Sequence, residues 1–245
     1  MNPYPESVDG REVFTPISLL RRVVERIEGV APEAIPFPFT RLYNLIACRL
    51  PIREVYVYVA EEAERWAGGR AIRVLDVGTG PGHLPIEIAK RLKNAEVVGI
   101  DLSVDMIHIA RENALKAGVQ DRVKFLVQNA SSLEFPERRF DLVVSTGSLH
   151  HWKRAVGALN EIYRVLERGG EAWIYDLNAE PSMEEIREFE SKYGKLLSTL
   201  VNGIVLAHSS ITLNDIELLA KRSRFTKYSL EKPLPLWLEL KLYKI

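Results

Sequence analysis

Residues 73–86 read RVLDVGTGPGHLPI, an apolar run that ends in an acid and passes through a glycine-rich turn into a helical pattern. The aliphatic part of this run predicts a strand buried in a parallel sheet, because both faces of such a sheet are covered. Gly78, Gly80 and Gly82 have no Cβ atom, so they permit a tight turn and a close approach of a ligand to the backbone. From Leu84 onward the apolar spacing predicts an amphipathic helix whose first N–H groups face that ligand. The stretch therefore predicts the first βα turn of a nucleotide-binding α/β sheet.

After this turn the sequence alternates between strand-like and helix-like patterns, which is typical of βαβ units in a parallel sheet. Near the C-terminus, leucines at every second position favour a hairpin-like last pair of strands. We therefore expect an α/β fold with a mostly parallel seven-stranded sheet and helices on both faces. The expected strands are 72–77, 96–101, 123–128, 140–145, 171–177, 226–230 and 236–243; the expected helices are 84–92, 104–117 with Ser103 or Asp105 as the cap, one through Val165 that ends at Gly169-Gly170, 182–206 and 214–222.

The first 70 residues show helical patterns but no strand-like ones. Apolar residues recur at helical spacing in 17–27, 39–46 and 55–66, and Gly68-Gly69 is expected to end the third helix. Because these segments precede the first strand, we expect them to pack on the sheet or to cover its ligand-binding edge. Residues 1–70 are thus expected to form a helical N-terminal lid, and residues 71–245 the ligand-binding domain, with a helical insert at about 181–212.

The composition excludes several classes of protein but does not identify a binding partner. Lys and Arg number 33, and so do Asp and Glu, so no net charge argues for nucleic acid or for a membrane surface. Cys48 is the single cysteine, which excludes an intramolecular disulfide and a multi-cysteine metal site. No apolar run is long enough to span a bilayer, and residues 1–10 have no signal-peptide pattern. We expect a cytoplasmic protein with no membrane partner.

Two kinds of ligand are compatible with a glycine turn after the first strand. A nicotinamide or flavin site has the spacing G-x-G-x-x-G, but the position three after Gly80 is His83. Asp76, two residues before the first glycine, would repel a pyrophosphate and attract an ammonium group. S-adenosylmethionine has a cationic amino-acid end and no phosphate. The stretch therefore favours this methyl donor.

Further segments complete a pattern that is similar to a known family. The chain resembles class I S-adenosylmethionine-dependent methyltransferases, in the type 11 branch that includes quinone-biosynthesis methyltransferases. The resemblance implies a Rossmann-like class I methyltransferase fold, S-adenosyl-L-methionine as donor and S-adenosyl-L-homocysteine as product. It leaves the acceptor unidentified, and it implies that the first 70 residues and the insert build the acceptor pocket. The matching segments are 74–82 (VLDVGTGPG), 99–103 (GIDLS) with Met106 and Ala110, 129–130 (NA), 140–145 (FDLVVS), 149–152 (LHHW) and 164–170 (RVLERGG).

The resemblance assigns the methionine end of the donor to the glycine turn. Asp76, Gly78, Thr79, Gly80 and Gly82 would contact or order that end. The simpler interpretation is a structural turn with a capping acid.

Other residues are assigned to the ribose and the adenine. Asp101 ends the second strand at the carboxyl edge of the sheet, and its two oxygens can accept both ribose hydroxyls; a helix N-cap is the alternative. Leu102 and Met106 would pack on the adenine, although a methionine at helical spacing is equally a core residue. Asn129 stands where the family often has aspartate, and it keeps one acceptor oxygen for the adenine amine. Ala130 would offer a backbone N–H.

Two last donor contacts are expected farther away in the sequence. Thr146, together with Gly147, should lie near the sulfonium. Tyr43 resembles an N-terminal tyrosine that folds over the donor, and core packing is an equally good interpretation of it.

Catalytic residues are weakly indicated. His150 and His151 would serve as a general base if either takes part, but adjacent residues at a helix start do not share a face, and pocket lining is the simpler role. No third ligand stands at metal spacing, so no metal site is expected. Asp176, at the end of the fifth strand, is the best acidic candidate for a substrate contact. A satisfied strand-end carboxylate is the alternative.

Three functions remain open at this point. We favour a small-molecule methyltransferase, since alignment of the reactants supplies much of the acceleration of methyl transfer. The alternative is an RNA base methyltransferase, suggested by the basic and aromatic tract 221–228, KRSRFTKY. The neutral net charge counts against RNA. A non-catalytic protein that binds the donor is the third possibility.

Overall fold

The computed structural model of the chain describes residues 7–8, 11–12, 51–199, 201 and 211–245. The expected helices within 17–27 and 39–46 lie outside these residues, as do Tyr43 and Cys48. Among the helices of the described part, none is long and apolar enough to cross a membrane.

A seven-stranded sheet forms the centre of the fold, in the order β5-β4-β3-β6-β7-β9-β8. The strands β5, β4, β3, β6 and β7 are parallel, whereas β9 is antiparallel to both of its neighbours. The architecture confirms the expected mostly parallel sheet with a hairpin-like last pair. The strands are β3 Arg73–Val77, β4 Glu96–Asp101, β5 Val123–Val127, β6 Phe140–Thr146, β7 Leu166–Leu177, β8 Lys227–Glu231 and β9 Trp237–Tyr243, with β1 Ser7–Val8 and β2 Arg11–Glu12 as a separate ladder.

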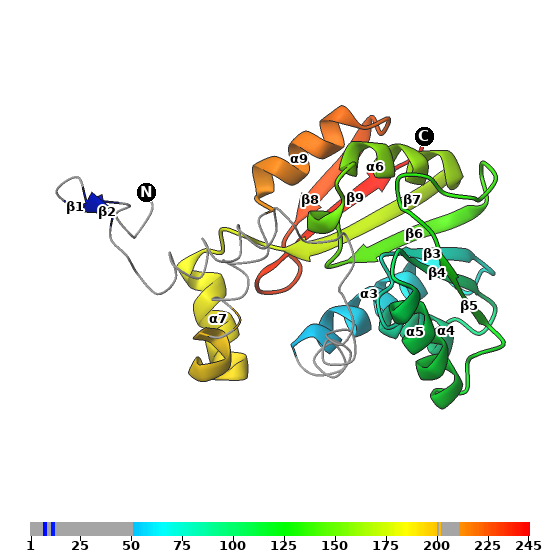
Figure 1. Ribbon diagram of the computed structural model, residues 1–245, viewed down its shortest axis with the longest axis horizontal. Coiled ribbons are helices and arrows are strands. Elements are labelled where there is room, and N and C mark those ends of the chain that lie inside the picture. The colour runs from blue at the N-terminus through cyan, green and yellow to red at the C-terminus, as the bar shows by residue number, and fades with distance from the viewer. Residues whose placement is uncertain (1–6, 9–10, 13–50, 200, 202–210) are drawn as a thin grey trace.

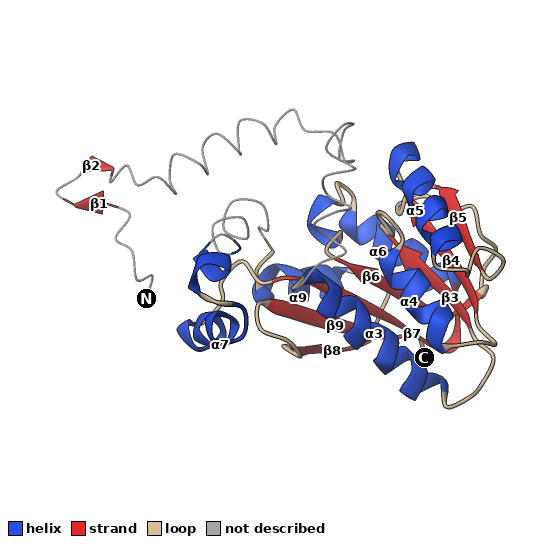
Figure 2. Ribbon diagram, turned by 90° about the horizontal axis from the view of Figure 1, so that it is seen from below, coloured by secondary structure: helices blue, strands red, loops and turns tan. Residues whose placement is uncertain are grey.

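Helices cover both faces of this sheet (Figure 1 and Figure 2). One face packs against α3, α4 and α5, and the other against α6 and α9. Side chains alternate between these two apolar layers along each strand, as a β-strand requires. The helices are α3 Ile52–Ala67, α4 His83–Arg91, α5 Val104–Lys116, the 3₁₀ turn η1 Leu149–His151, α6 Ala155–Val165, α7 Met183–Tyr193 and α9 Leu213–Arg222.

Helix α3 is the part of the N-terminal segment that packs on the sheet. Its buried side chains include Val55, Val59 and Ala63, which follow the helical spacing read from the sequence. Gly68 ends it in the left-handed conformation, with a φ of 55°, and donates its N–H to the Glu64 carbonyl. The predicted glycine stop is therefore confirmed, since glycine adopts this conformation without steric cost.

Two expected helix boundaries are wrong. The helix expected over 182–206 already ends at Tyr193, where Gly194 caps it with a φ of 85°. The other wrong boundary is the end of α6. The helix α6 ends at Val165 rather than at the glycine pair, because Leu166 already pairs with Phe140 of β6. Leu142 next pairs with Glu171, so the residues 167–170 bulge out of the ladder. Gly170 fits there because a Cβ atom would come within 2.8 Å of the Asp141 carbonyl oxygen. The glycines thus mark a bulge inside β7.

Strand β9 shows both faces of the sheet clearly. Its leucines pack toward α6 and α9, as the alternation predicted. On the opposite face, Glu239 is 1% exposed; it accepts a hydrogen bond from the Tyr175 hydroxyl, and its Oε1 lies 3.3 Å from Lys241 Nζ. Lys241 also reaches Glu62 of α3 at 3.5 Å. Polar contacts therefore join α3 to this part of the sheet.

The helical insert is described in part. Helix α7 lies beyond the carboxyl end of β7 (Figure 1). It begins with a capping box, in which the Ser182 hydroxyl accepts from the Glu185 N–H and the Glu185 carboxylate accepts from the Ser182 N–H. Residues 202–210 of the insert lie outside the described part.

Candidate functional site

The glycine turn between β3 and α4 is fastened to the end of β4. The N–H groups of Gly78 and Thr79 both donate to the Ile100 carbonyl, at 2.9 and 2.8 Å. The next N–H, that of Gly80, donates to Asp101 Oδ2 at 2.9 Å. Three consecutive amides of the turn are thus satisfied by two residues. This arrangement places the turn at the carboxyl edge of the sheet, where open α/β sheets bind ligands.

Space at this turn excludes side chains. Gly78 has a φ of +73°, and a Cβ atom there would lie 2.4 Å from Ser148 Oγ. Gly82 has a φ of +78°, and a Cβ would lie 2.8 Å from both Ala110 Cβ and the Phe125 ring. Both positions require glycine on steric grounds, independently of any ligand.

Asp76 is a buried acid whose hydrogen bonding is incomplete. It is 1% exposed, and burial raises its pKa to about 7; the charge of Asp101 adds to the rise, and the nearby Thr79 hydroxyl opposes it. Asp76 Oδ1 and Thr79 Oγ1 are both buried with no hydrogen-bond partner among the described residues. A buried carboxylate oxygen without a donor is costly, and a cationic amine supplies both charge and donors. The residues present therefore fit the amino-acid end of a sulfonium donor.

Asp101 is held between two loops. Its Oδ1 accepts from the Ser103 N–H at 2.8 Å, while Oδ2 accepts from Gly80. Ser103, rather than Asp101, caps α5, because its hydroxyl accepts from the Met106 N–H at 3.3 Å. Burial raises the pKa of Asp101, and the backbone N–H groups around it oppose that rise. Each carboxylate oxygen has a second lone-pair direction, so the group fits a pair of vicinal hydroxyls.

The surface beside Asp101 is partly apolar. Leu102 is 40% exposed, whereas Met106 is buried in the core. Val127, which pairs with Asp101 in the sheet, is 46% exposed although it is β-branched and apolar. Val127 was not predicted as a site residue, because its exposure depends on the position of β5 at the edge of the sheet. Asn129 is exposed, and its Oδ1 accepts from the Ser131 N–H at 2.8 Å.

The end of β6 forms the third side of the site. Thr146 is half-buried, and Gly147 donates its N–H to the Tyr175 carbonyl at 2.8 Å. The Ser148 hydroxyl lies 2.7 Å from the Ser145 hydroxyl and donates to the Val77 carbonyl at 3.2 Å. These contacts tie the ends of β3, β6 and β7 together. Ser145 and Ser148 were not predicted as site residues, since only the tertiary structure pairs their hydroxyls.

His150 and Asp176 form a close pair at this same edge. His150 Nδ1 lies 2.7 Å from Asp176 Oδ1, and the His150 backbone N–H donates to Oδ2 at 3.1 Å. The Leu177 N–H also donates to Oδ1, at 2.8 Å. A carboxylate oxygen accepts hydrogen bonds, so this contact is a hydrogen bond in the tautomer that carries its hydrogen on Nδ1. Asp176 is fully buried.

His151 lies beside His150, contrary to expectation. The two ring centroids are 4.0 Å apart with an interplanar angle of 51°. The two rings come together because the segment is a single 3₁₀ turn and not the start of an α-helix. In the described residues no cluster of three potential ligands could hold a metal ion.

The predicted site residues thus fall into two neighbouring groups, with exceptions. Asp76, the glycine turn and Asp101 are joined by hydrogen bonds and electrostatics, and His150 and Asp176 pair beyond the end of β6. Ala130 is half-buried near the end of β5. Tyr43 lies outside the described residues.

Comparisons with known proteins agree with the methyl donor that the sequence predicts. A family model described as a methyltransferase domain matches residues 69–228. Demethylmenaquinone methyltransferase of Bacteroides fragilis is 28% identical over 128 residues, which cover 52% of each chain. The 27-O-demethylrifamycin SV methyltransferase of Amycolatopsis mediterranei is 34% identical over 143 residues, which cover 58% of this chain and 46% of the relative. The chain therefore spans about half the length of the curated relatives it matches.

A solved structure extends the likeness to the fold as a whole. The SAM-dependent methyltransferase of Aquifex aeolicus superimposes with a TM-score of 0.65 at 17% identity. The match covers 86% of this chain and 100% of that one. At this identity the likeness concerns the fold alone.

Replacement of Asp76 by Asn is expected to remove a pH-dependent cost of folding. Because the folded-state pKa of about 7 exceeds the ordinary 3.8, the folded state retains a proton that the unfolded state releases, so stability falls as pH rises between these values. Relative to wild type, the variant should gain at most about 4 kcal/mol between about pH 4 and pH 8. Urea unfolding at both pH values measures this gain. The exposed Asp105→Asn serves as the control, and an identical pH dependence in wild type and Asp76→Asn would contradict the assignment.

Proposed function

The chain belongs to the methyltransferase-domain family, the class I S-adenosylmethionine-dependent methyltransferases, and on this premise we propose that it methylates a small aromatic acceptor of the quinol type. The observation that carries the proposal is the His150–Asp176 pair at the carboxyl edge, 2.7 Å apart. An amine acceptor needs little help, whereas a hydroxyl or a ring carbon needs a base. Relatives named for demethylmenaquinone supply the acceptor class.

The donor would be held by the residues around the glycine turn. We propose that Asp76 and Thr79, with their incomplete hydrogen bonding, receive the amino-acid end. Asp101 would accept the two ribose hydroxyls on the lone pairs that Gly80 and Ser103 leave available. When bound, the donor supplies an electrophilic methyl group on a sulfonium.

The adenine would lie farther along the same edge. Leu102 offers exposed apolar surface, and the Asn129 side chain and the Ala130 N–H are near the end of β5. Met106 would support this surface from beneath, since it is buried. Thr146 would border the reacting sulfur, and the proposed place of Tyr43 over the donor rests on the resemblance alone.

His150 is proposed to accept the proton of the acceptor hydroxyl on Nε2. Asp176 stabilises the imidazolium that results and fixes the ring orientation through Nδ1. Loss of that proton raises the electron density of the ring carbon beside the oxygen, which makes the carbon a nucleophile. That carbon would take the methyl group as the bond between methyl and sulfur breaks. The ring then regains aromaticity when the methylated carbon loses its hydrogen as a proton to water, while the imidazolium returns its proton to the oxygen. Asp176 is thus a positioning residue, and His150 the general base.

Oxygen methylation is the second candidate within the same site. The name of the rifamycin relative refers to methylation of an oxygen atom. The same general base would also activate a hydroxyl group as the nucleophile. The product distinguishes the two chemistries, since an ether and a ring methyl differ in their fragmentation. The close His150–Asp176 pair favours a catalytic protein over one that only binds the donor.

RNA is less well supported as the methyl acceptor, because the tract 221–228 is engaged within the protein. In the tract 221–228, Lys221 pairs with Glu217 at 2.8 Å and the Tyr228 hydroxyl donates to the same carboxylate. Phe225 is buried, so it cannot stack on a base. The tract that suggested RNA therefore contributes largely to internal contacts.

The function is tested with purified protein, S-adenosylmethionine and reduced demethylmenaquinone carrying a short side chain. We expect a methylated product by mass spectrometry, together with S-adenosylhomocysteine. Total RNA and a dihydroxynaphthalene are assayed in parallel. Methylation of RNA but of neither quinol would contradict the proposed acceptor class.

Asp101→Ala is expected to weaken S-adenosylhomocysteine binding at least tenfold, because two hydrogen bonds to a charged group are lost. Calorimetry measures the affinity, and circular dichroism checks the fold. Asp105→Ala, on the first turn of the next helix, is the matched control. Equal affinity in wild type and Asp101→Ala would remove the ribose assignment.

Asp176→Asn should lower kcat about a hundredfold while leaving donor affinity unchanged, since it disturbs the tautomer of His150 without touching the donor site. The pH–rate profile should lose its ascending limb in His150→Gln. The control variant is His151→Gln, because His151 is the exposed neighbour of His150, and this variant should retain most of the activity. A loss of donor affinity equal to the loss of kcat would indicate a structural role instead.

A further inference from the structure

The Ser148 side chain points away from the short helix that this residue begins. Ser148 is the N-cap residue of η1, and a serine at an N-cap ordinarily accepts a hydrogen bond from an N–H of the first turn. The Ser148 hydroxyl makes no such bond. It donates instead to the carbonyl of Val77, the last residue of β3, at 3.2 Å. The η1 segment is therefore bonded directly to the strand that leads into the glycine turn.

The Ser148 hydroxyl also contacts the hydroxyl of Ser145. The two Oγ atoms are 2.7 Å apart, and both residues are buried. A carbonyl oxygen only accepts hydrogen bonds, so the Ser148 hydrogen points to Val77 and Ser148 Oγ accepts the hydrogen of Ser145. The bond from Ser148 to β3 thus has a defined direction and is shielded from water.

The peptide group between Val77 and Gly78 is held from two sides. Its carbonyl oxygen accepts from Ser148, and its N–H donates to the Ile100 carbonyl of β4 at 2.9 Å. The parallel ladder between β3 and β6 ends one residue earlier, at Asp76. Ser148 therefore extends the connection between these strands to the residue that precedes the glycine turn.

Ser148 also packs on Gly78. A Cβ atom at Gly78 would lie 2.4 Å from Ser148 Oγ and 2.5 Å from its Cβ, so the serine occupies the space that a side chain there would need. A movement of η1 toward the turn would bring these atoms into collision. A movement away from the turn would break the hydrogen bond to Val77. Ser148 thereby fixes the separation of η1 and the turn in both directions.

His150 follows Ser148 by two residues within the same short helix. The His150 N–H donates to Asp176 Oδ2 at 3.1 Å, and the ring Nδ1 lies 2.7 Å from Oδ1. The His151 N–H donates to the Ser148 carbonyl at 3.0 Å, which closes the single turn. Because the turn is short and closed, a displacement of Ser148 is carried to His150.

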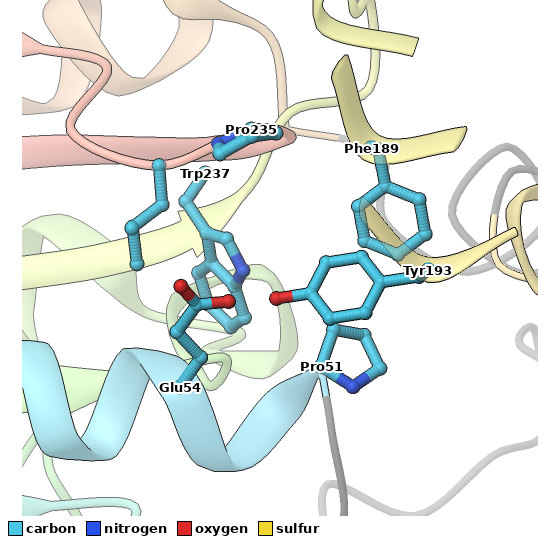
Figure 3. Close-up of a pocket in the computed structure, with 7 residues that line it drawn as sticks. Pro51, Glu54, Phe189, Tyr193, Pro235 and Trp237 are labelled. Carbon is cyan, nitrogen blue, oxygen red and sulfur yellow. The ribbon is translucent and has the colours of Figure 1, made fainter. Parts of the chain in front are cut away.

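Trp237 bounds the same segment from the side of β9. Its Cη2 atom lies 3.9 Å from the place that a Cβ atom on Gly147 would occupy, and the indole is 7% exposed. Glu54 of α3 and Tyr193 of α7 point toward this indole (Figure 3). The chain between β6 and η1 therefore runs along a buried ring, which limits how far Ser148 can move.

We propose that Ser148 is a positioning residue for methyl transfer, which holds the general base His150 at a fixed distance from the turn that binds the methyl donor. The role of His150 as the base rests on the proposed function, whereas the link between η1 and β3 rests on the contacts alone. Ser148 acts through His150 and not on a reactant. Because the reaction depends on alignment, a displacement of about 1 Å can cost about a hundredfold in rate.

The test compares Ser148→Ala with Ser223→Ala in the full chain. Ser148→Ala keeps the Cβ atom and removes the hydroxyl. Ser223→Ala is the matched control, because it also removes a serine hydroxyl that donates to a main-chain carbonyl, that of Ala220 at 2.7 Å, at the end of α9. Melting curves show that each variant is folded.

Hydrogen exchange followed by mass spectrometry measures the link itself and needs no acceptor. In protein saturated with S-adenosylhomocysteine, the amides of η1 should exchange at least about tenfold faster in Ser148→Ala than in wild type, because one attachment of the turn is lost. Ser223→Ala should exchange there as wild type does. Equal exchange of η1 in Ser148→Ala and wild type would overturn the inference.

Kinetics with the quinol measure the consequence for the reaction. Ser148→Ala should lower kcat about tenfold, while calorimetry should find the affinity for S-adenosylhomocysteine within about threefold of wild type, because the N–H anchors of the turn remain. In the His150→Gln background the same substitution should lower kcat no further, since no base is left to position. Additive losses of kcat, or a loss of donor affinity as large as the loss of kcat, would indicate a purely structural role and overturn the inference.

The two measurements separate this inference from the proposed function. If wild type methylates the quinol and Ser148→Ala keeps its kcat, the inference is wrong and the function stands. If η1 exchanges faster in Ser148→Ala alone and wild type methylates no quinol, the link between η1 and β3 stands and the proposed function is wrong.

Discussion

Three successive amides that donate to the end of one strand determine the geometry of the site. Gly78, Thr79 and Gly80 give their N–H groups to Ile100 and Asp101, so the β3–α4 turn cannot shift without breaking the end of β4. A buried N–H without a partner costs about 1–3 kcal/mol. Because a shift of the turn would break all three hydrogen bonds together, the three bonds form and break as a unit. The same bonds orient the Asp101 carboxylate. Turn and ribose-binding candidate are therefore one rigid unit.

Three acids at one edge of the sheet are stabilised in different ways. Asp76 is buried without a countercharge, and its pKa rises to about 7. Asp101 is stabilised by backbone N–H groups, and Asp176 by two backbone N–H groups together with His150. Like charges at one edge would repel if all were ionised and exposed. Neutralisation, backbone dipoles and an imidazole each offset part of that repulsion.

The order and type of the strands and the glycine turn were predictable, because they depend on local patterns. The two faces of β9 followed from the same local signals, which also narrowed the cap of α5 to Ser103 or Asp105, and Ser103 is the cap. What depends on tertiary structure was not predictable. The contact between His150 and Asp176 needs the β6–β7 register, and Trp237 reaches Gly147 only because β9 runs antiparallel to β7. The predicted end of α6 was wrong for the same reason, since Leu166 pairs with Phe140 in the sheet.

The bulge at 167–170 lies at the amino edge of β6 and β7, on the side opposite to the ligand edge. Gly169 and Gly170 are anchored there by two backbone hydrogen bonds with Lys244, whereas Arg168 is exposed. Exposed segments with few anchoring contacts tolerate added chain well. A fluorescent reporter or an affinity handle spliced between Glu167 and Arg168 would leave both the anchored glycines and the opposite edge undisturbed. The bulge is thus a natural attachment point for immobilising the protein with its ligand edge facing solution.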